Sequence, residues 1–376
     1  MQNINPAVRP APKNYHFSAE ALLGRAPIVL DTSEICKEID NRVVLITGAA
    51  GSIGSELAWQ LCALNSAKLI LVDQAETALN DLDLQLQEQF VTLELHAYVA
   101  DITDFGRMDV IFKQFQPQII FHAAAYKHVP FMEKHPYEAI KVNVFGVETM
   151  AKLAMAHRVE KFVLVSTDKA VNPSSVMGAT KRVAEMYLQA LSHSKQSPTQ
   201  WIITRFGNVL RSNGSFILTF EKQIKAGGPI TVTHPEVSRY IMTASEACQL
   251  VLQACAIGKN GQILFFDMGR PVLITDIGKR MIRLSGLKLG RDIEIVYTGL
   301  RPGEKLLETL FHENEKPFMG NEESKICIST TAHQAFCPTT TLKMLREAME
   351  SGDDAVMISA LKTIVPEYQE FVAQIC

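Results

Sequence analysis

The stretch VVLITGAAGSIG, residues 43–54, decides how this chain folds. Its first five residues, VVLIT, are mostly apolar and β-branched, which predicts a buried parallel strand. Three glycines follow, and the next residues, SELAWQLCAL, favour a helix. A strand that turns through glycines into a helix is typical of a dinucleotide-binding turn, in which N–H groups at the helix N-terminus face the phosphates. The cofactor contacts predicted at this turn are Gly48, Gly51, Ser52, Ile53 and Gly54.

Each glycine has a separate reason for its place in the turn. Gly48 allows the tight turn, Gly51 lets the backbone approach a pyrophosphate, and Gly54 lets the helix pack close to the strand. A glycine triplet alone is a weak signal, because tight turns without a ligand are common. Here a second apolar strand, KLILVD, ends in Asp73, 19 residues after Gly54, where a carboxylate meets the adenosine ribose. Asp73 favours NAD over NADP, since a carboxylate repels a 2′-phosphate.

Composition and charge restrict the class of protein. At 376 residues the chain is long for one domain, which favours a main domain with an added lobe. A hydrophobic share of 47% and a charged share of 20% are ordinary for a soluble enzyme. The net charge of −3 gives no electrostatic case for a nucleic-acid or anionic-membrane partner. The seven cysteines form no CxxC motif or paired framework, so we expect buried free thiols in a reducing cytoplasm.

The first residues of the sequence show no targeting pattern. Apolar runs are strand-sized, so no bilayer span is expected, and residues 1–14 lack the apolar segment of a signal peptide. The same residues are rich in proline and without periodicity, which predicts a mobile arm. Residues 16–31 have a possible helix cap at Ser18, and we expect them to pack on the outside of the core domain.

From residue 42 the chain alternates strands with helices. Strands are expected at 43–47, 68–72, 95–99, 118–123, 161–166 and 201–205, and helices between them at 54–64, 76–88, 104–115, 136–157 and 177–193. This alternation predicts an α/β fold, a Rossmann-type doubly wound parallel sheet with a smaller C-terminal substrate-binding lobe. The predicted domains are an N-terminal arm at 1–40, a Rossmann domain at 41–206 plus about 230–275, and the lobe at 207–229 plus 276–376.

Further candidates follow the third and fourth strands. Asp101 and Ile102 come after the third strand, where they can reach an adenine edge. The fourth strand ends in Ala123, Ala124 and Ala125, whose small size lets a flat ring or ribose lie against the sheet, although close packing alone would also explain them. Asn143 lies inside a predicted helix and needs a polar partner, either a backbone carbonyl or a water near the site.

The fifth strand carries the chemistry that we expect. It ends in Ser166-Thr167-Asp168-Lys169, which brings a hydroxyl, a carboxylate and an ammonium to the carboxyl edge of the sheet. Met177 and Lys181 open the next helix, and their four-residue spacing puts them on one face. The sequence therefore predicts the catalytic centre at this edge, beside the expected nicotinamide position.

Seven segments together resemble a known family. They are LLGR (22–25), VLITGAAGSIGSEL (44–57), FHAAAYKHVPFME (121–133), VSTDKAVNPSSVMGATKRVAE (165–185), RFGNVL (205–210), ITVTHPEVSRYIM (230–242) and GLRPGEKLLE (299–308). The chain resembles the extended short-chain dehydrogenases/reductases, and more closely the CapD-like polysaccharide-biosynthesis enzymes, which are NAD-dependent nucleotide-sugar 4,6-dehydratases. The resemblance covers most of residues 20–310, and the tail beyond about 330 carries no such motif.

The resemblance implies a reaction and roles for four residues. Sugar C4 gives a hydride to NAD, a base removes the C5 proton, an acid protonates the departing O6, and the hydride returns to C6. Asp168 is implied as the acid at O6, which requires a raised carboxyl pKa, and Lys169 as the base at C5, which requires a lowered amine pKa. Thr167 is implied to hydrogen-bond O4 and Lys181 to hold the nicotinamide ribose.

Met177 departs from the wider family. Most short-chain dehydrogenases have a tyrosine at this position, which removes the C4 hydroxyl proton, and a thioether cannot do so. Either the protein only binds a nucleotide, or it is similar to the WbpM- and PglF-like dehydratases, which also carry methionine there. We favour the second reading, because Thr167-Asp168-Lys169 would otherwise have no reason to be intact beside a cofactor site. The acceptor of the O4 proton is then open, with Asp168 or an ordered water as the candidates.

The turn-rich loops after residue 205 are the expected substrate-binding part. By resemblance, Asn208 contacts the nucleotide diphosphate end, Arg239 and Arg301 clamp the pyrophosphate, and Glu304 orients Arg301 or binds a ribose. Without the family, each arginine is just as well a surface residue. Lys127 and His128 follow the fourth strand and could touch the sugar, although His128 could equally be structural. No cluster has metal-ligand spacing, so no metal is expected.

The substrate expected from the resemblance is UDP-N-acetylglucosamine, and a homo-oligomer is the expected assembly. A nucleotide-sugar 4-epimerase and a non-catalytic nucleotide-binding protein are the alternatives. Epimerases lack the acid–base pair after the strand, which counts against the first, and Met177 is the one feature that supports the second. In larger relatives, segments like LLGR follow membrane helices, so the chain could be the cytoplasmic catalytic part of such a protein.

Overall fold

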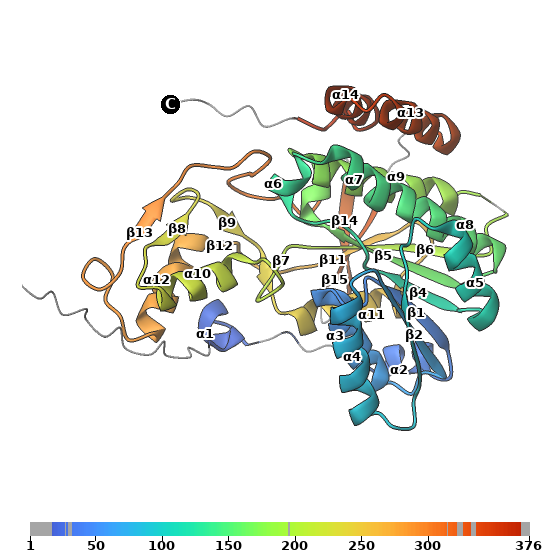
Figure 1. Ribbon diagram of the computed structural model, residues 1–376, viewed down its shortest axis with the longest axis horizontal. Coiled ribbons are helices and arrows are strands. Elements are labelled where there is room, and N and C mark those ends of the chain that lie inside the picture. Colours follow the sequence, from blue (N-terminus) through green and yellow to red (C-terminus); the bar gives the residue numbers. More distant parts are fainter. Residues whose placement is uncertain are drawn as a thin grey trace, which may run out of the picture.

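The protein folds around a nine-stranded sheet with a small lobe at one side (Figure 1). The computed structural model describes residues 17–26, 28, 32–194, 196–313, 315–321, 326–331 and 336–369. The predicted arm at 1–14 lies outside these residues. In the part of the chain that is described, no helix combines the length and the apolar character needed to cross a bilayer.

The sheet has the strand order of a doubly wound fold. Its parallel strands are β1 (Val43–Thr47), β2 (Lys68–Asp73), β3 (Glu94–Val99), β4 (Ile119–His122), β5 (Lys161–Thr167), β6 (Gln200–Phe206) and β11 (Ile263–Phe266). They are arranged as β3-β2-β1-β4-β5-β6-β11, so the order reverses between β1 and β4. Ligands of such sheets bind outside the carboxyl ends of the strands, at this reversal. The predicted Rossmann-type sheet is confirmed, and the first six strands begin and end within one residue of their predicted bounds.

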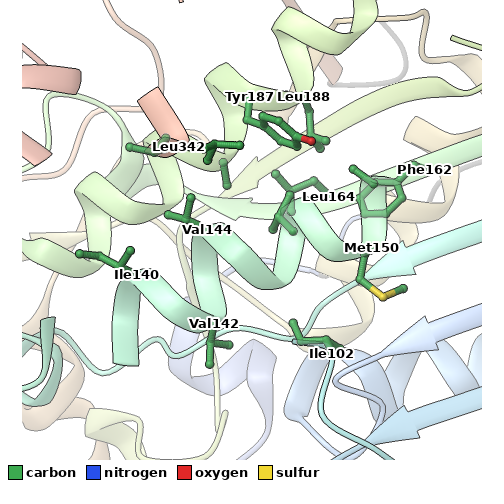
Figure 2. Close-up of a cluster of buried hydrophobic side chains, with 14 of the residues drawn as sticks. Ile102, Ile140, Val142, Val144, Met150, Phe162, Leu164, Tyr187, Leu188 and Leu342 are labelled. Atoms are coloured by element: carbon green, nitrogen blue, oxygen red, sulfur yellow. The ribbon is translucent and has the colours of Figure 1, made fainter. Parts of the chain in front are cut away.

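Helices cover both faces of the sheet. On one face lie α2 (Ser33–Ile39), α3 (Ser52–Cys62), α4 (Glu76–Gln89) and α11 (Ala244–Ile257). On the other lie α5 (Phe105–Phe115), α6 (Val129–Met132), α7 (Pro136–Ile140), α8 (Val147–Ala156) and α9 (Val176–Ser192). Figure 2 shows part of the apolar cluster on this second face, where Leu164 of β5 lies near Met150 of α8 and Leu188 of α9. This packing fixes α9 on the end of β5, where the chemistry is expected.

The predicted helix at 136–157 is interrupted. Between α7 and α8 the chain forms a π-helical turn, Lys141–Gly146. Asn143 lies in this turn, and its side chain is hydrogen-bonded to the backbone of Tyr126. A Cβ on Gly146, at the end of the turn, would overlap Ile102 Cδ1. Such wide turns inside α-helices are frequent at functional sites, and this one supports the loop after β4.

The C-terminal segment belongs to the sheet and not to the lobe. Strand β14 (Glu315–Asn321) pairs antiparallel with β15 (Ile326–Thr331), which pairs antiparallel with β11. Helices α13 (Pro338–Glu350) and α14 (Asp354–Ile364) then pack together, and α14 also contacts α7 and α9. The prediction that 276–376 forms the lobe is therefore wrong for β14, β15, α13 and α14. Strands β14 and β15 pair with each other, and the pairing of β15 with β11 joins them to the sheet.

The small lobe combines three separate parts of the chain. It contains α1 (Ala19–Leu23), α10 (Phe216–Lys225), α12 (Ile274–Leu284) and the strand pairs β8 (Ile230–Val232) with β13 (Ile295–Tyr297) and β9 (Ser238–Arg239) with β12 (Val272–Leu273). The remaining pair, β7 (Asn208–Val209) with β10 (Ile241–Met242), joins the lobe to the sheet (Figure 1). Residues 230–239 were predicted in the Rossmann domain, and this prediction is wrong because β8 and β9 pair inside the lobe.

Helix α1 also lies elsewhere than predicted. Ser18 caps it, as expected, by accepting a hydrogen bond from Ala21 N at 3.1 Å. Its apolar side chains Leu22 and Leu23 are buried in the lobe cluster, and Arg280 of α12 donates to the Leu22 carbonyl at 2.8 Å. The helix thus covers the lobe and not the outside of the core domain.

Candidate active site

The glycine turn between β1 and α3 has the geometry that the sequence predicts. Gly48 has a φ of +68°, and a Cβ there would lie 2.6 Å from Ala124 N. A Cβ on Gly54 would overlap the Gly48 carbonyl oxygen, so this glycine is required for α3 to pack on the turn. Gly51 is the N-cap of α3, and the Ser52 hydroxyl next to it accepts a hydrogen bond from Asn213 N at 2.9 Å. The N–H groups of Ala49, Ala50 and Gly51 are bonded within the protein, so the donors that this turn can offer to a ligand are those of the first turn of α3.

A small cavity of about 140 Å³ adjoins this turn on the β2 side. Asp73 lines it at the end of β2, where its Oδ2 accepts from Ala50 N and its Oδ1 from Ala75 N, both at 2.9 Å. Asp101 lines it at the end of β3 and accepts from Thr103 N at 2.8 Å. The remaining predicted residues in its wall are Gly48, Gly51, Ile102, Ala123, Ala124 and Ala125. The residues expected around adenosine thus surround one cavity.

A larger cavity of about 680 Å³ lies between the sheet edge and the lobe, and it shares Gly48, Gly51, Ala123 and Ala125 with the small one. Both parts of the molecule contribute to its wall. The predicted site residues that line it, beyond the glycine turn, are Lys127, His128, Thr167, Lys169, Met177, Lys181, Asn208, Arg239, Arg301 and Glu304. Ser52 and Ile53 line it as well. The structure therefore brings residues that are far apart in the sequence to one site.

Thr167, Asp168 and Lys169 form a hydrogen-bonded chain at the end of β5. Thr167 Oγ1 donates to Asp168 Oδ1 at 2.9 Å, and Lys169 Nζ donates to the same oxygen at 2.9 Å. Asp168 is fully buried, and its Oδ2 has no hydrogen-bond partner among the described residues. Because Thr167 and Lys169 line the large cavity and Asp168 bonds to both, a proton can pass between these three groups.

The charge of Lys169 differs from the expectation. Burial opposes its ammonium form, but the carboxylates of Asp168 and Glu308 outweigh burial and raise the pKa of Lys169 above its ordinary value. The predicted lowering of the Lys169 pKa is therefore wrong for the protein alone. Lys181 donates to the Val165 carbonyl at 2.7 Å, and burial lowers the pKa of Lys181 to about 8.

Met177 lies at the first turn of α9, one helical turn before Lys181, and only 3% of it is exposed. It faces the large cavity, so the thioether occupies the place where a tyrosine would present its hydroxyl. In the hydrogen-bonded chain Thr167-Asp168-Lys169, the hydroxyl group is that of Thr167.

Asn143 does not reach either cavity. It is fully buried, its Oδ1 accepts from Tyr126 N at 2.8 Å, and its Nδ2 donates to Tyr126 O at 3.0 Å and to Thr180 Oγ1 at 3.1 Å. The assignment of Asn143 to substrate binding is therefore wrong. The partner is a backbone carbonyl, one of the two possibilities, and the side chain ties the loop after β4 to α9.

The loop residues fall into a buried and an exposed group. Arg239 is 5% exposed and donates to the carbonyls of Ser238 and Leu306, at 2.7 and 3.2 Å. Arg301 is exposed at the cavity rim, and Glu304 lies between the two arginines, 3.4 Å from Arg239 Nη2 and 3.3 Å from Arg301 Nε. Lys127 and His128 are exposed and also line the large cavity.

Asn208 lies deeper than its predicted role at the diphosphate end suggests. Its Oδ1 accepts from Lys169 Nζ at 3.4 Å, so it stands beside the catalytic chain. Its position follows from β7, which pairs with β10 directly after β6 ends.

Sequence reasoning missed one carboxylate in the cavity wall. Glu308 is 2% exposed, lines the large cavity and stands 3.9 Å from Lys169 Nζ. Lys305 stands 3.5 Å from its other oxygen. Both residues were within the quoted segment GLRPGEKLLE, where the four-residue distance to Glu304 was the only available signal.

A buried cluster of charges behind the site was also missed. Arg205 of β6 donates from Nε and Nη2 to the two oxygens of Glu185 at 2.9 and 2.6 Å, and from Nη1 to Glu315 of β14 at 2.7 Å. Ser166 Oγ donates to Glu185 Oε1 at 2.6 Å. Ser166 directly precedes Thr167, and Glu185 follows Lys181 on α9. This cluster therefore holds the end of β5, which carries Thr167-Asp168-Lys169, against α9.

Within the described residues, no three His, Cys, Asp or Glu side chains are grouped so that they could hold a metal ion. The chemical groups that the site offers are a hydrogen-bonded hydroxyl, carboxylate and amine, the N-terminus of α3 after the glycine turn, and arginines at the lobe side.

Comparison with known proteins agrees with this geometry. The chain is 48% identical over 297 residues to the capsular polysaccharide biosynthesis protein CapD of Staphylococcus aureus, which covers 79% of this chain and 49% of CapD. It is 33% identical over 275 residues to a UDP-glucose 4-epimerase of Rickettsia canadensis, covering 72% of this chain and 77% of the epimerase. The solved structure of Pen from Bacillus thuringiensis has a TM-score of 0.70 at 30% identity, covering 80% of this chain and 89% of Pen.

The chain thus spans about half the length of CapD. The family model described as "Polysaccharide biosynthesis protein" matches residues 44–330, which include the glycine turn, Thr167-Asp168-Lys169 and the parts of the lobe other than α1. This chain therefore belongs to that polysaccharide biosynthesis protein family.

Proposed function

We propose that this protein is an NAD-dependent nucleotide-sugar 4,6-dehydratase that acts on UDP-N-acetylglucosamine and gives a 4-keto-6-deoxy sugar for surface polysaccharide or glycan biosynthesis. The observation that carries the proposal is the chain of hydrogen bonds from Thr167 through Asp168 to Lys169, which stands in a large cavity beside a dinucleotide-type turn. A reaction that needs an acid and a base at neighbouring carbons suits such a chain.

The residues around the glycine turn fit NAD. Gly48 and Gly54 let the turn pack closely against Ala124 and α3, Gly51 is the N-cap of α3, and Asp73 holds a carboxylate at the end of β2. These features suit a pyrophosphate over the helix N-terminus and a ribose at Asp73. Lys181 is the residue we assign to the nicotinamide ribose. When bound, NAD supplies the acceptor for a hydride from sugar C4 and returns it at C6.

The proton on O4 is the first that the protein must take. Thr167 Oγ1 can accept it while it passes its own proton to Asp168 Oδ1, 2.9 Å away, so the missing tyrosine at Met177 is not needed. Asp168 then carries the proton that the departing O6 requires. The same proton leaves the sugar at O4 and returns to it at O6, and the water that departs balances the reaction.

Lys169 must be a neutral amine to remove the C5 proton. In the protein alone, its ammonium is stabilised by the Asp168 carboxylate. Once Asp168 has accepted the O4 proton, this attraction ends, and the Lys169 pKa falls because burial then dominates. The Lys169 ammonium then releases one proton to solvent in the cavity, so that Asp168 holds the acid proton and Lys169 is the neutral base. Lys169 takes the C5 proton, delivers one of its ammonium hydrogens to C5 after the elimination, and regains a proton from solvent at the end of the cycle.

The lobe supplies groups for the UDP part. Arg239 is buried in the cavity wall and Arg301 stands at the rim, and Glu304 stands between them. Guanidinium groups bind diphosphates through paired donors, so we assign the two arginines to the pyrophosphate. We assign Lys127 and His128, which also line the large cavity, to the sugar.

Product analysis tests this proposal. The purified full chain is incubated with UDP-N-acetylglucosamine, and separately with UDP-N-acetylgalactosamine, and the products are identified by mass spectrometry and NMR. We expect a product that has lost the mass of one water and carries a 4-ketone and a C6 methyl group. If neither sugar nucleotide loses water, the dehydratase proposal is wrong.

A 4-epimerase is the second candidate, because a UDP-glucose 4-epimerase is among the relatives. Epimerisation needs a hydride transfer at C4 but no proton transfer at C5, so it would leave the Asp168–Lys169 pair without a task. Conversion of UDP-N-acetylglucosamine into its C4 epimer without loss of water would favour this candidate. Homo-oligomeric assembly and a cytoplasmic location remain proposals that rest on the family.

A further inference from the structure

Glu308 is a buried carboxylate that the proposed chemistry does not yet use. It lines the large cavity with 2% of its surface exposed. Its Oε1 is 3.9 Å from Lys169 Nζ, and its Oε2 is 3.5 Å from Lys305 Nζ. A carboxylate is rarely buried to this extent unless opposite charges compensate it, and here two lysines do so.

Four charged side chains alternate in sign, from Asp168 through Lys169 and Glu308 to Lys305. Asp168 contacts Lys169 at 2.9 Å, Lys169 faces Glu308, and Glu308 faces Lys305, which also donates to the Val171 carbonyl at 3.0 Å. Asp168 approaches Lys169 from the end of β5, whereas Glu308 and Lys305 approach from the lobe side. Lys169 is therefore held between a carboxylate of the sheet and a carboxylate of the lobe.

We propose that Glu308 is a positioning residue that, together with Lys305, fixes the place and the protonation of the base Lys169. This inference deepens the proposed function and rests on it for the role of Lys169. It explains why the base stays charged and in place before a substrate binds, when Asp168 alone holds it at only one side. After Asp168 takes up a proton, Glu308 is the carboxylate that still attracts the Lys169 ammonium.

Other groups around Lys169 act on it in known directions. Arg239 opposes the Lys169 ammonium through its positive charge, and the neutral Asn208 accepts a hydrogen bond from it. Lys305 opposes it as well, and Glu308 and Asp168 favour it. Removing Glu308 should therefore lower the pKa of Lys169, and removing Lys305 should raise it.

The experiment measures Lys169 without turnover. The full chain and its variants are labelled with trace acetic anhydride across a range of pH, and the peptide that contains Lys169 is quantified by mass spectrometry. Because only the neutral amine reacts, the rising part of the curve reports the Lys169 pKa. We expect Glu308→Gln to move this part to lower pH by about one unit, which is about a tenfold faster labelling at a fixed pH below it. Lys305→Gln should move it to higher pH.

Glu221→Gln is the matched control, since Glu221 is a buried carboxylate that pairs with Arg211 at 3.0 Å and lies outside the cavity wall. It should leave the Lys169 curve unchanged. A Lys169 curve that stays in place in both Glu308→Gln and Lys305→Gln overturns the inference, and if Glu308→Gln does not fold, the Lys305→Gln shift decides it.

The outcome is separate from that of the product assay. The chain could make no dehydrated product while the two variants still move the Lys169 labelling curve in opposite directions. In that case the proposed function is wrong, and the effect of Glu308 on Lys169 is confirmed. If the product forms and the curves do not move, only the role of Glu308 fails. In the active case, the rising limb of the pH–rate profile should move with the labelling curve, which a purely structural role of Glu308 would not cause.

Discussion

At the scale of single residues, the proposed reaction depends on the amine of Lys169. Its Nζ is bonded to Asp168 and lines the cavity, so it is the group that can reach a sugar proton. Lys169→Met keeps the length of the side chain but removes the amine, and we expect kcat to fall by about 10²- to 10⁴-fold, the usual contribution of a general base. Steady-state assays of product formation measure this.

Lys222→Met is the matched control for this variant, because Lys222 is exposed on α10 and lies outside the cavity wall. It should keep the wild-type rate. A Lys169→Met enzyme that retains wild-type kcat would exclude Lys169 as the base.

His122 gives a prediction about stability. It is fully buried at the end of β4, where its Nδ1 lies 2.9 Å from Thr47 Oγ1, and burial with a smaller effect of Lys181 lowers its pKa to about 3. The unfolded chain, with a histidine pKa of about 6.5, therefore binds more protons between the two values. Stability from His122 is present above about pH 6.5 and is lost as the pH falls towards 3.

The measurement is urea unfolding at pH 7 and pH 5. Between these values the wild type should lose about 2 kcal/mol more free energy of unfolding than His122→Gln, because the buried imidazole resists protonation. The exposed His135→Gln serves as the control and should follow the wild type. Equal losses in the wild type and in His122→Gln would show that His122 does not titrate as described.

At the scale of elements, two glycines of the turn from β1 to α3 have different tasks, Gly54 in packing and Gly51 in ligand binding. A Cβ on Gly54 would overlap the Gly48 carbonyl, whereas a Cβ on Gly51 would lie 3.2 Å from the same oxygen and needs only a small adjustment. We expect Gly54→Ala to lower the melting temperature clearly, because α3 must move. Gly51→Ala should melt close to the wild type but bind NAD at least about tenfold more weakly, since its methyl group blocks the pyrophosphate.

Thermal unfolding and titration calorimetry with NAD test this pair of variants. The account of the turn would be contradicted if Gly51→Ala bound NAD as tightly as the wild type.

The buried charge cluster links three elements. Arg205 of β6 stands between Glu185 of α9 and Glu315 of β14, and all three are fully buried or nearly so. Arg205→Met would remove the buried hydrogen bonds to both carboxylates and leave Arg182, 3.2 Å from Glu185 and 3.9 Å from Glu315, as a partial replacement for the lost cation. We therefore expect a loss of about 3 kcal/mol in the free energy of unfolding. Denaturant unfolding measures it.

Arg291→Met is the comparison, because Arg291 pairs with Asp292 on the surface with 66% of its side chain exposed. Surface pairs of this kind contribute little, so the variant should unfold like the wild type. A similar small effect in Arg205→Met would mean that the cluster does not hold β14 to the sheet.

At the scale of the whole molecule, the cavity needs both the sheet edge and the lobe. Strands β1, β2, β4, β5 and β6 were predictable because each is a short, mostly apolar run that ends at turn residues, and burial on both faces requires such runs. Strand β3 is a partly exposed edge strand without such a run. The glycine turn, Asp73 and the Thr167-Asp168-Lys169 chain were predictable for the same reason, since each directly follows or ends a strand.

Other features depend on contacts that no local pattern reports. β14 joins the sheet at an edge where Glu315 meets Arg205, 110 residues away in sequence. Asn143 turns away from the site because a π-helical turn aims it at Tyr126. Glu308 enters the cavity from a loop of the lobe, so only the packing of the lobe against the sheet brings it to Lys169.

One measurement tests the central claim most directly. The purified chain is incubated with UDP-N-acetylglucosamine in D₂O, and the product is examined by NMR. The account predicts a 4-keto-6-deoxy product that carries solvent deuterium at C5, because Lys169 removes the C5 proton and then delivers a hydrogen of its solvent-exchanged amine, and no net NADH, because the hydride returns to C6. A product without deuterium at C5, or recovery of the sugar unchanged except at C4, would contradict it.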